Sequence, residues 1–282
     1  MVVRRRALPA GWYPLSEPEV DQQFREWESR AEAPPHPCAV SIVVPHAGWH
    51  YSGNLAFAAM RSLARGAGTV VIIGGHLAES APFLALRADE FEVPNGRIRA
   101  DVELLDRIAA QIPLLSDSEP DNTVEVQLPI VRYLFPHARI VGLRAPASLR
   151  AIGLGVAIFK AAEALGRVVV VVGSTDLTHY GAQYRFSPAG SGEKARLWVQ
   201  EKNDAGMIEL LLDMEGESSI AYAESMRAAC SIGAAVAALS FASLHGVSRG
   251  VLRGYGTSFS GHRSESFVGY AGISYSPAES SD

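Results

Sequence analysis

The chain has 282 residues, of which 48% are apolar and 20% charged, and its formal net charge is −5. This composition supplies a packed core, and the mild acidity with one short basic run, Arg4-Arg5-Arg6, argues against both disorder and nucleic-acid binding. No apolar stretch approaches a membrane span, no signal-peptide segment follows the arginines, and two cysteines cannot build a disulfide framework, so a reduced cytoplasmic location is expected.

Strands and helices are expected to alternate along the chain. Periodicity and terminal signals place, in chain order, strand 40–44, helix 55–64, strand 69–73, helices 101–111 and 123–135, strand 139–143, helix 148–164, strand 167–172, helices 193–212 and 228–244, and strands 251–255 and 267–275. Asn54, Asp101 and Ser148 are the expected N-caps, and Pro129 is expected to kink or divide its helix. The five valines at 168–172 suit a strand buried on both faces.

This alternation has no internal repeat and no linker. It predicts a single α/β domain over residues 1–282. The tail at 276–282, Ser-Pro-Ala-Glu-Ser-Ser-Asp, is expected to fray.

Polar residues follow several of the apolar runs. His46 and His76 come after the first two predicted strands, Asp176 and His179 follow the valine strand, and Cys230 lies at the start of an apolar helix. Loops at the carboxyl ends of strands build the sites of open α/β sheets, so these residues can meet in one crevice. Neutral imidazoles with a thiolate or carboxylate are ligands of transition metals. The pattern therefore indicates a mononuclear metalloprotein.

Each of these residues also has a purely structural explanation. His46 and His76 can be hydrogen-bonded structural histidines, and Gly74-Gly75 either admits a close neighbour or makes a turn. Asp176 either orients the imidazole three residues later or caps a helix. Cys230 is either core packing or, if its thiol lies near a helix N-terminus and a metal, a ligand. Their shared placement at strand ends favours the metal site.

Other catalytic motifs are absent from the sequence. Gly173-Ser174-Thr175 lacks the Gly-x-Ser-x-Gly pattern, and the segment from Gly48 to Gly53 lacks the lysine of a phosphate-binding loop. No His-Glu-x-x-His or Cys-x-x-Cys element occurs. The motifs give no support to a hydrolase.

Longer motifs carry a family resemblance. They are Ala10-Gly11-Trp12-Tyr13-Pro14, Pro45-His46-Ala47-Gly48-Trp49, Tyr51-Ser52-Gly53, Glu125-Val126-Gln127-Leu128-Pro129, Ser174-Thr175-Asp176-Leu177-Thr178-His179-Tyr180-Gly181 and finally Cys230. The chain resembles the Memo family, whose bacterial members are called AmmeMemoRadiSam system protein B. The matches run in order over nearly the whole chain.

The resemblance implies a three-layer α/β/α domain with a central mixed, mostly parallel sheet, related to class III extradiol dioxygenases. Those enzymes hold Fe(II) with two histidines and a glutamate and use a further histidine as acid/base. By similarity, His46 and His76 would be the histidine ligands, and Cys230 would replace the carboxylate. His179 would match the acid/base histidine, with Asp176 beside it. Fe(II) is the implied ion, with copper or zinc as alternatives.

Four further residues are assigned to the substrate-binding wall, namely Trp49, Tyr51, Asn122 and Glu125. Two of them mark departures from the family pattern, which has tyrosine in place of Trp49 and histidine in place of Asn122. The segment before the second histidine also departs, since Ile73-Gly74-Gly75-His76 stands where the family often has Gly-Pro-x-His. The ligands are retained, whereas the pocket wall has changed.

Two function classes follow from the sequence. The first is a non-haem iron oxygenase or related redox enzyme that acts on a small molecule, in which His179 moves protons. The second is a non-enzymatic metal-binding or peptide-binding adaptor that uses the same crevice. No membrane or nucleic-acid partner is expected, and the sequence identifies neither the substrate nor the oligomeric state.

Overall fold

The computed structural model describes residues 1–30, 37–261 and 264–278. The strands are β1 (Val3–Arg4), β2 (Ser41–Val44), β3 (Thr69–Gly74), β4 (Phe83–Ala85), β5 (Glu90–Val93), β6 (Gly96–Arg99), β7 (Leu114–Ser116), β8 (Arg139–Arg144), β9 (Val169–Ser174), β10 (His179–Tyr180), β11 (Val251–Thr257) and β12 (Phe267–Tyr275). The helices are α1 (Glu17–Arg30), α2 (Trp49–Met60), α3 (Val102–Ala109), α4 (Asn122–Glu125), α5 (Leu128–Leu134), α6 (Arg150–Ala164), α7 (Gly192–Trp198), α8 (Asp204–Leu212), α9 (Gly216–Met226), α10 (Ile232–Ser243) and α11 (Ser258–Gly261).

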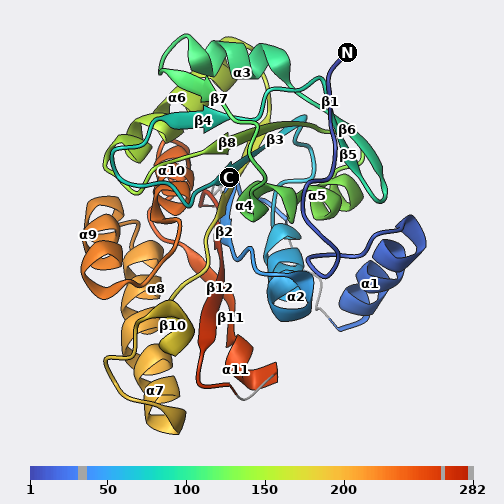
Figure 1. Cartoon of the computed structure of the whole chain (residues 1–282). Coiled ribbons are helices and arrows are strands. Elements are labelled where there is room, and N and C mark those ends of the chain that lie inside the picture. The colour runs from blue at the N-terminus through green and yellow to red at the C-terminus, as the bar shows by residue number, and fades with distance from the viewer. Residues whose placement is uncertain (31–36, 262–263, 279–282) are drawn as a thin grey trace.

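A mixed sheet forms the centre of the molecule. Its strand order is β10-β12-β2-β9-β3-β8-β4-β7. Strand β11 is not part of this order and pairs with β12 in antiparallel orientation. The neighbours β2, β9, β3 and β8 are parallel, whereas β12 and β4 join this parallel centre in antiparallel orientation. A small separate sheet, β1-β5-β6, lies beside α5 (Figure 1). The predicted α/β class with a mostly parallel, mixed sheet is confirmed.

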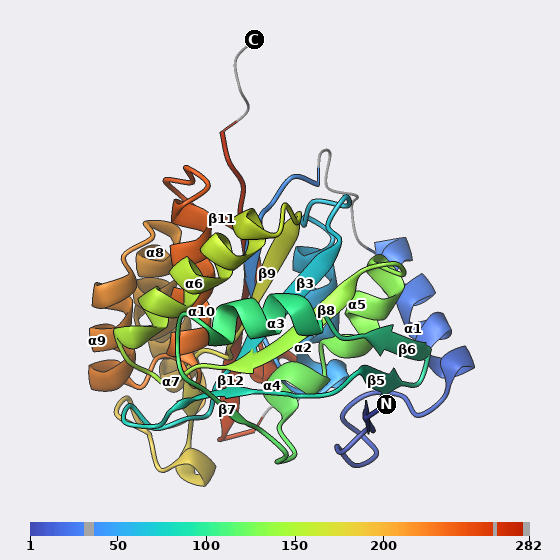
Figure 2. The same ribbon diagram turned by 90° about the horizontal axis from the view of Figure 1, so that it is seen from above.

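The two faces of the sheet carry separate cores, because successive side chains of a strand point to opposite faces. Val169 and Val171 pack with the helices α3, α6, α8, α9 and α10. Val170 and Val172 pack with the helices α1, α2 and α5 on the other face. All six residues of β9 are buried, as expected for a strand covered on both sides. Figures 1 and 2 show the resulting three layers.

The first residues of helices α2 and α10 differ from the predicted ones. Helix α2 begins at Trp49, ahead of the predicted start at residue 55, and therefore contains Gly53. A Cβ at residue 53 would lie 2.6 Å from Cη2 of Trp27, so this glycine serves helix packing. At α10 the helix begins only at Ile232, which leaves Cys230 in the preceding loop.

Of the other predicted helix caps and breaks, those at Asp101 and Pro129 are confirmed and the cap at Ser148 is wrong. Asp101 caps α3 by accepting a hydrogen bond from the Leu104 amide, as predicted. Pro129 divides the predicted helix into α4 and α5 and lies in the first turn of α5, where an amide N–H is not needed. Ser148 does not cap α6, which begins at Arg150 after Leu149 and has no side-chain cap.

The predicted helix 193–212 is interrupted. It consists of α7, a π-helical turn at Val199–Asn203, and α8. Helices α1 and α9 were not predicted from the sequence. Of the tail expected to fray, residues 276–278 have no regular structure and 279–282 lie outside the described residues. Among the helices that the structure describes, none combines the length and apolar character needed to cross a membrane.

Candidate metal centre

The candidate site lies where the carboxyl ends of three adjacent strands meet. His46 follows β2, His76 follows β3, and Asp176 follows β9, and the strand order β2-β9-β3 places these loops side by side. Cys230 arrives from the connection between α9 and α10, whose backbone docks on the β9 loop through Cys230 N–H donating to Asp176 O at 3.2 Å. The structure thus brings together residues that the sequence separates by up to 184 positions.

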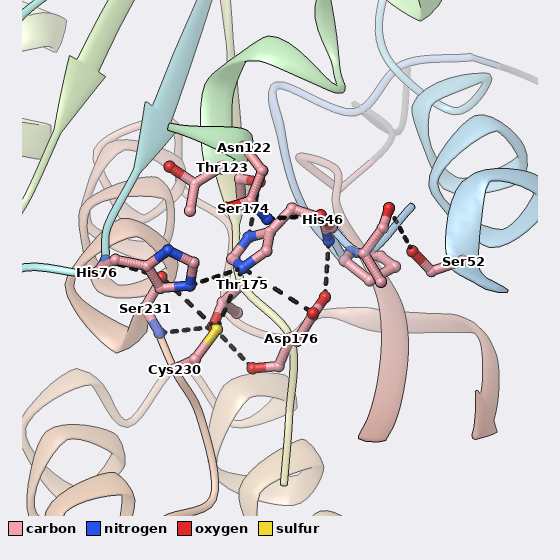
Figure 3. Close-up of polar contacts among 12 residues, drawn as sticks. His46, Ser52, His76, Asn122, Thr123, Ser174, Thr175, Asp176, Cys230 and Ser231 are labelled. Atoms are coloured by element: carbon pink, nitrogen blue, oxygen red, sulfur yellow. Dashed lines mark hydrogen bonds and ion pairs between the residues drawn. The ribbon is translucent and has the colours of Figure 1, made fainter. Parts of the chain in front are cut away.

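Three donor atoms converge at this point, as Figure 3 shows. Nε2 of His46 lies 3.2 Å from Nε2 of His76 and 3.2 Å from Sγ of Cys230. All three atoms lie within 4.8 Å of one another. We call these residues the donor triad.

The donor triad fits a single metal ion. Metal–nitrogen and metal–sulfur bonds near 2.0 and 2.3 Å place tetrahedral ligand atoms about 3.3–3.6 Å apart, close to the separations in the triad. Imidazole and thiolate donors suit iron, copper or zinc and disfavour magnesium or calcium. The geometry supports a metal site without identifying the metal.

The far nitrogen of each imidazole has its own partner. Nδ1 of His46 lies 3.2 Å from Oγ of Ser174, and Nδ1 of His76 lies 3.5 Å from Oδ2 of Asp121. Asp121 is in turn held by the Arg144 guanidinium at 3.2 Å. Such outer contacts fix the ring orientation of metal-binding histidines. Here they turn both Nε2 atoms toward the same point.

The paired glycines before His76 permit close approach of two neighbouring elements. A Cβ at Gly74 would overlap the Thr123 side chain, and one at Gly75 would overlap Ser231. The Ser231 hydroxyl accepts the His76 amide at 3.2 Å. His76 itself adopts the left-handed region, with φ of 57°. Because residues other than glycine rarely adopt this backbone conformation, His76 is a locally strained position of the kind found at functional sites.

When no metal is bound, the electrostatics of the donor triad lower the pKa of the thiol and raise the pKa values of both imidazoles. Burial opposes charge on all three groups, but neighbouring groups outweigh it. His46 and His76 hold the pKa of the Cys230 thiol well below its ordinary value. Cys230 and Asp176 raise the pKa of His46, and contacts with Asp121 and Cys230 raise the pKa of His76 to about 10. A metal would compete with protons for the imidazole nitrogens and the thiolate, so metal binding would weaken as the pH falls.

Asp176 stands between the donor triad and His179. Its Oδ1 accepts the His46 amide at 2.7 Å, while Oδ2 lies 4.0 Å from Nε2 of His46 and 3.8 Å from Nε2 of His179. Although burial opposes ionisation, His46 and His179 hold the pKa of Asp176 below its ordinary value. The buried carboxylate therefore faces two imidazoles. The His179 ring stacks on Tyr184 with its centroid 4.9 Å away.

A cavity of about 470 Å³ opens above these residues. Its wall combines imidazoles, aromatic rings and hydroxyl groups from Trp12, His46, Ala47, Gly48, Tyr51, His76, Asn122, Asp176, His179, Gln183, Tyr184, Ser258, Ser264, Ser266, Val268 and Tyr270. The volume is within the range of small-molecule sites.

Two of the four residues assigned to the substrate wall line this cavity. Tyr51 is 54% exposed there, and the Asn122 side chain lines it while donating to the His46 carbonyl at 2.9 Å. Trp49 instead packs among aromatic rings behind the wall, and its indole N–H donates to Val126 O at 3.0 Å. Glu125 is also turned away from the cavity.

The Glu125 carboxylate holds the N-terminal segment. It accepts the amides of Ala7 and Leu8 and the Tyr13 hydroxyl at 2.9–3.2 Å. This segment also contacts α2, where the Trp49 amide donates to Trp12 O at 2.8 Å. Trp49 and Glu125, which were assigned to the substrate wall, therefore lie outside the cavity lining and contact the segment that carries Trp12.

Several residues around the site were missed from the sequence. Asp121 stands next to Asn122, and a carboxylate near a candidate ligand was an available signal. Ser174 also lay within a recognised motif. Tyr184 and Tyr270 carried no comparable signal, because only the chain connections beyond β10 and β11 bring them to the cavity.

Comparisons with known proteins agree with the family resemblance that the sequence motifs carry. The family model described as "Memo-like protein" matches residues 4–274. A MEMO1 family protein from Pyrococcus furiosus is 30% identical over 285 residues, which cover 95% of this chain and 98% of the relative. Another from Methanococcoides burtonii is 32% identical over 284 residues, covering 96% of this chain and 99% of the relative.

A solved structure shares the fold. The crystal structure of uncharacterized protein JW3007 from Escherichia coli K12 superposes with a TM-score of 0.51 at 12% identity, covering 83% of this chain and 98% of that chain. At this identity the similarity concerns the fold alone.

Proposed function

Because the chain belongs to the Memo-like protein family, we propose that it is a mononuclear metalloenzyme for redox chemistry on a small molecule. His46, His76 and Cys230 would hold the ion, with Fe(II) as the first choice and copper or zinc as alternatives. The observation that carries the proposal is the convergence of two Nε2 atoms and one Sγ beside a cavity that His46 and His76 line. Iron bound there would supply redox and Lewis-acid chemistry.

The protein's own contribution is proton transfer and orientation. The His179 side chain is 31% exposed and lines the cavity, so its imidazole would give a proton to a bound molecule or take one from it. Oδ2 of Asp176 lies 3.8 Å from Nε2 of His179, so this carboxylate would orient the ring. Its other oxygen is fixed by the His46 amide, so this carboxylate ties the acid/base group to the ligand loop.

The cavity supports a small-molecule substrate over a purely metal-storing role. A metal store needs only the donor triad, whereas here Trp12, Tyr51 and Tyr184 surround an open space beside it. Aromatic faces and hydroxyl groups together suit a molecule with an apolar body and polar substituents. The alternative, a non-enzymatic metal-binding or peptide-binding adaptor, would use the same crevice without needing an open metal position for a small ligand.

Nitric oxide tests this proposal. Protein reconstituted anaerobically with Fe(II) and exposed to nitric oxide is expected to give the paramagnetic signal of an open iron position, and His46→Ala/His76→Ala protein is expected to give none. His179→Gln is the matched control, since it changes a cavity imidazole outside the triad. Stoichiometric iron without a nitric oxide signal would support the adaptor instead. Full metal content in the double variant, or copper or zinc without iron in protein purified without added metal, would overturn the iron assignment.

A further inference from the structure

A buried carboxylate outside the donor triad holds the loop that carries Asp176 and His179. Asp204 is fully buried at the start of α8. Its Oδ1 accepts the Thr178 amide at 3.1 Å and also the Thr178 hydroxyl, while Oδ2 accepts the Tyr255 hydroxyl at 2.8 Å. All of these donors come from distant parts of the chain.

Thr178 is fixed from both sides. Its amide donates to Asp204, and its carbonyl accepts the Gly269 amide of β12 at 3.0 Å. A Cβ at Gly269 would overlap Oδ2 of Asp204, so a glycine in β12 lets the carboxylate lie against the strand. Thr178 immediately precedes His179. Its position therefore determines where β10 begins and where the His179 ring enters the cavity.

The π-helical turn places this carboxylate. In the turn Val199–Asn203 the Asp204 amide bonds to Val199 O, five residues back. The adjacent Asn203 is also buried, and its Nδ2 donates to Thr178 Oγ1 at 2.9 Å and to Met226 O at 3.0 Å. Consecutive residues thus both reach Thr178. Single π turns inside helices occur frequently at functional sites.

We infer that Asp204 is a positioning residue, whose carboxylate fixes the Asp176–His179 loop and so aims the His179 imidazole into the cavity. This inference rests on the proposed proton-transfer role of His179 for its meaning, but the contact network is independent of any metal. Removal of the carboxylate leaves the Thr178 amide and hydroxyl without an acceptor in a dry interior, a strongly unfavourable arrangement. The loop is expected to shift to find new partners.

The test observes the His179 ring directly, in metal-free full-length protein at pH 7.5. Histidine labelled with ¹³C at Cε1 gives one signal per ring, and the His179 signal is the one missing from His179→Gln protein. In Asp204→Ala that signal is expected to shift or broaden. The Thr178 amide is expected to exchange its hydrogen about tenfold faster or more, in line with a lost buried hydrogen bond.

Two variants separate positioning from general packing. Asp204→Asn keeps the shape and an Oδ1 acceptor, so it is expected to restore the His179 signal. Tyr255→Phe removes a hydrogen bond to the same carboxylate, but on the oxygen that Thr178 does not use, so it is expected to leave the His179 signal unchanged. An unchanged signal in Asp204→Ala, or an equal change in Tyr255→Phe, would overturn the inference.

A variant at Thr178 covers the case in which Asp204→Ala does not fold. Thr178→Val removes the hydroxyl that donates to Asp204 and accepts from Asn203 Nδ2, and it retains the side-chain shape and the amide bond to Asp204. It is expected to broaden the His179 signal to a smaller extent. No change in this variant would also overturn the inference. Because neither metal nor turnover enters the measurement, failure here leaves the proposed metal site untouched, and a failed metal site leaves this result readable.

Discussion

The floor of the cavity and its outer wall are built differently. The floor consists of His46, His76 and Asp176, which follow parallel strands and are tied by backbone and side-chain hydrogen bonds. The outer wall comes from the short turn Ala182–Tyr184 and from the segments on either side of α11. Its lining residues Gln183, Tyr184, Ser258, Ser264 and Ser266 are half-buried or exposed. In the proposed function, the floor and the outer wall have different tasks. Rigid strand ends suit metal ligands, which tolerate little displacement, whereas surface connections suit substrate selection, which varies between relatives with the same chemistry.

The largest effect should follow from a change in the floor. His46→Ala is expected to abolish stoichiometric metal binding, because it removes the Nε2 that lies 3.2 Å from each of the other two donor atoms, while the fold still unfolds cooperatively. Gln183→Ala, in the exposed outer wall, is the matched control and is expected to leave metal content unchanged and to change stability by no more than about 0.5 kcal/mol. Metal analysis with thermal unfolding measures both. Equal metal loss in the two variants would remove the distinction between floor and wall.

A change at the junction of floor and wall should affect chemistry but not metal. Once a turnover assay exists, His179→Ala is expected to lower turnover by roughly 10²–10⁴-fold, the usual contribution of a general acid/base. Metal content should stay at the wild-type level. Joint loss of metal and turnover would instead make His179 a ligand, and Asp176, His179 and Cys230 do form a second group of close donor atoms.

Metal removal should expose the thiol of Cys230, the third member of the donor triad. The pKa of Cys230 is held low by His46 and His76, so in metal-free protein it is a reactive thiolate, whereas a bound metal would shield it. Iodoacetamide is expected to label Cys230 only after chelation. The exposed Cys38 is the internal control and should be labelled alike in both states. Mass spectrometry counts the labels, and equal labelling of Cys230 in both states would exclude it as a ligand.

The smallest effect concerns the support of the His179 loop. Burial raises the pKa of Asp204 to about 6, above the value near 4 of an unfolded aspartate. Between these values the folded chain binds the extra proton, so the contribution of Asp204 to stability is present below about pH 4 and is lost as the pH rises through 6. The loss is on the order of 2–3 kcal/mol.

Asp204→Asn removes this titration. Its stability relative to wild type is expected to improve between pH 4.5 and 7.5 by about that amount, because the wild-type chain alone loses stability over this range. Urea unfolding at the two pH values measures the difference, and the other titrating groups are common to both proteins. A constant difference between the two chains would contradict the raised pKa of Asp204.

The sequence by itself determined the α/β class and the loops that carry His46, His76 and Asp176. Apolar runs encode burial on one or both faces of a strand, and the valines of β9 are indeed covered on both. Since adjacent parallel strands end at one edge, the residues after them converge. His46, His76 and Asp176 could therefore be grouped before any contact was known.

Only the tertiary structure decided which groups support these ligands. Asp121 behind His76 and Asp204 behind Thr178 depend on side chains that meet across the fold, and no local periodicity encodes such meetings. The same holds for Glu125, a motif residue whose carboxylate binds the N-terminal backbone more than a hundred positions away. Local sequence patterns report burial and turn geometry, whereas a polar side chain takes its role from the partners that the completed fold places beside it.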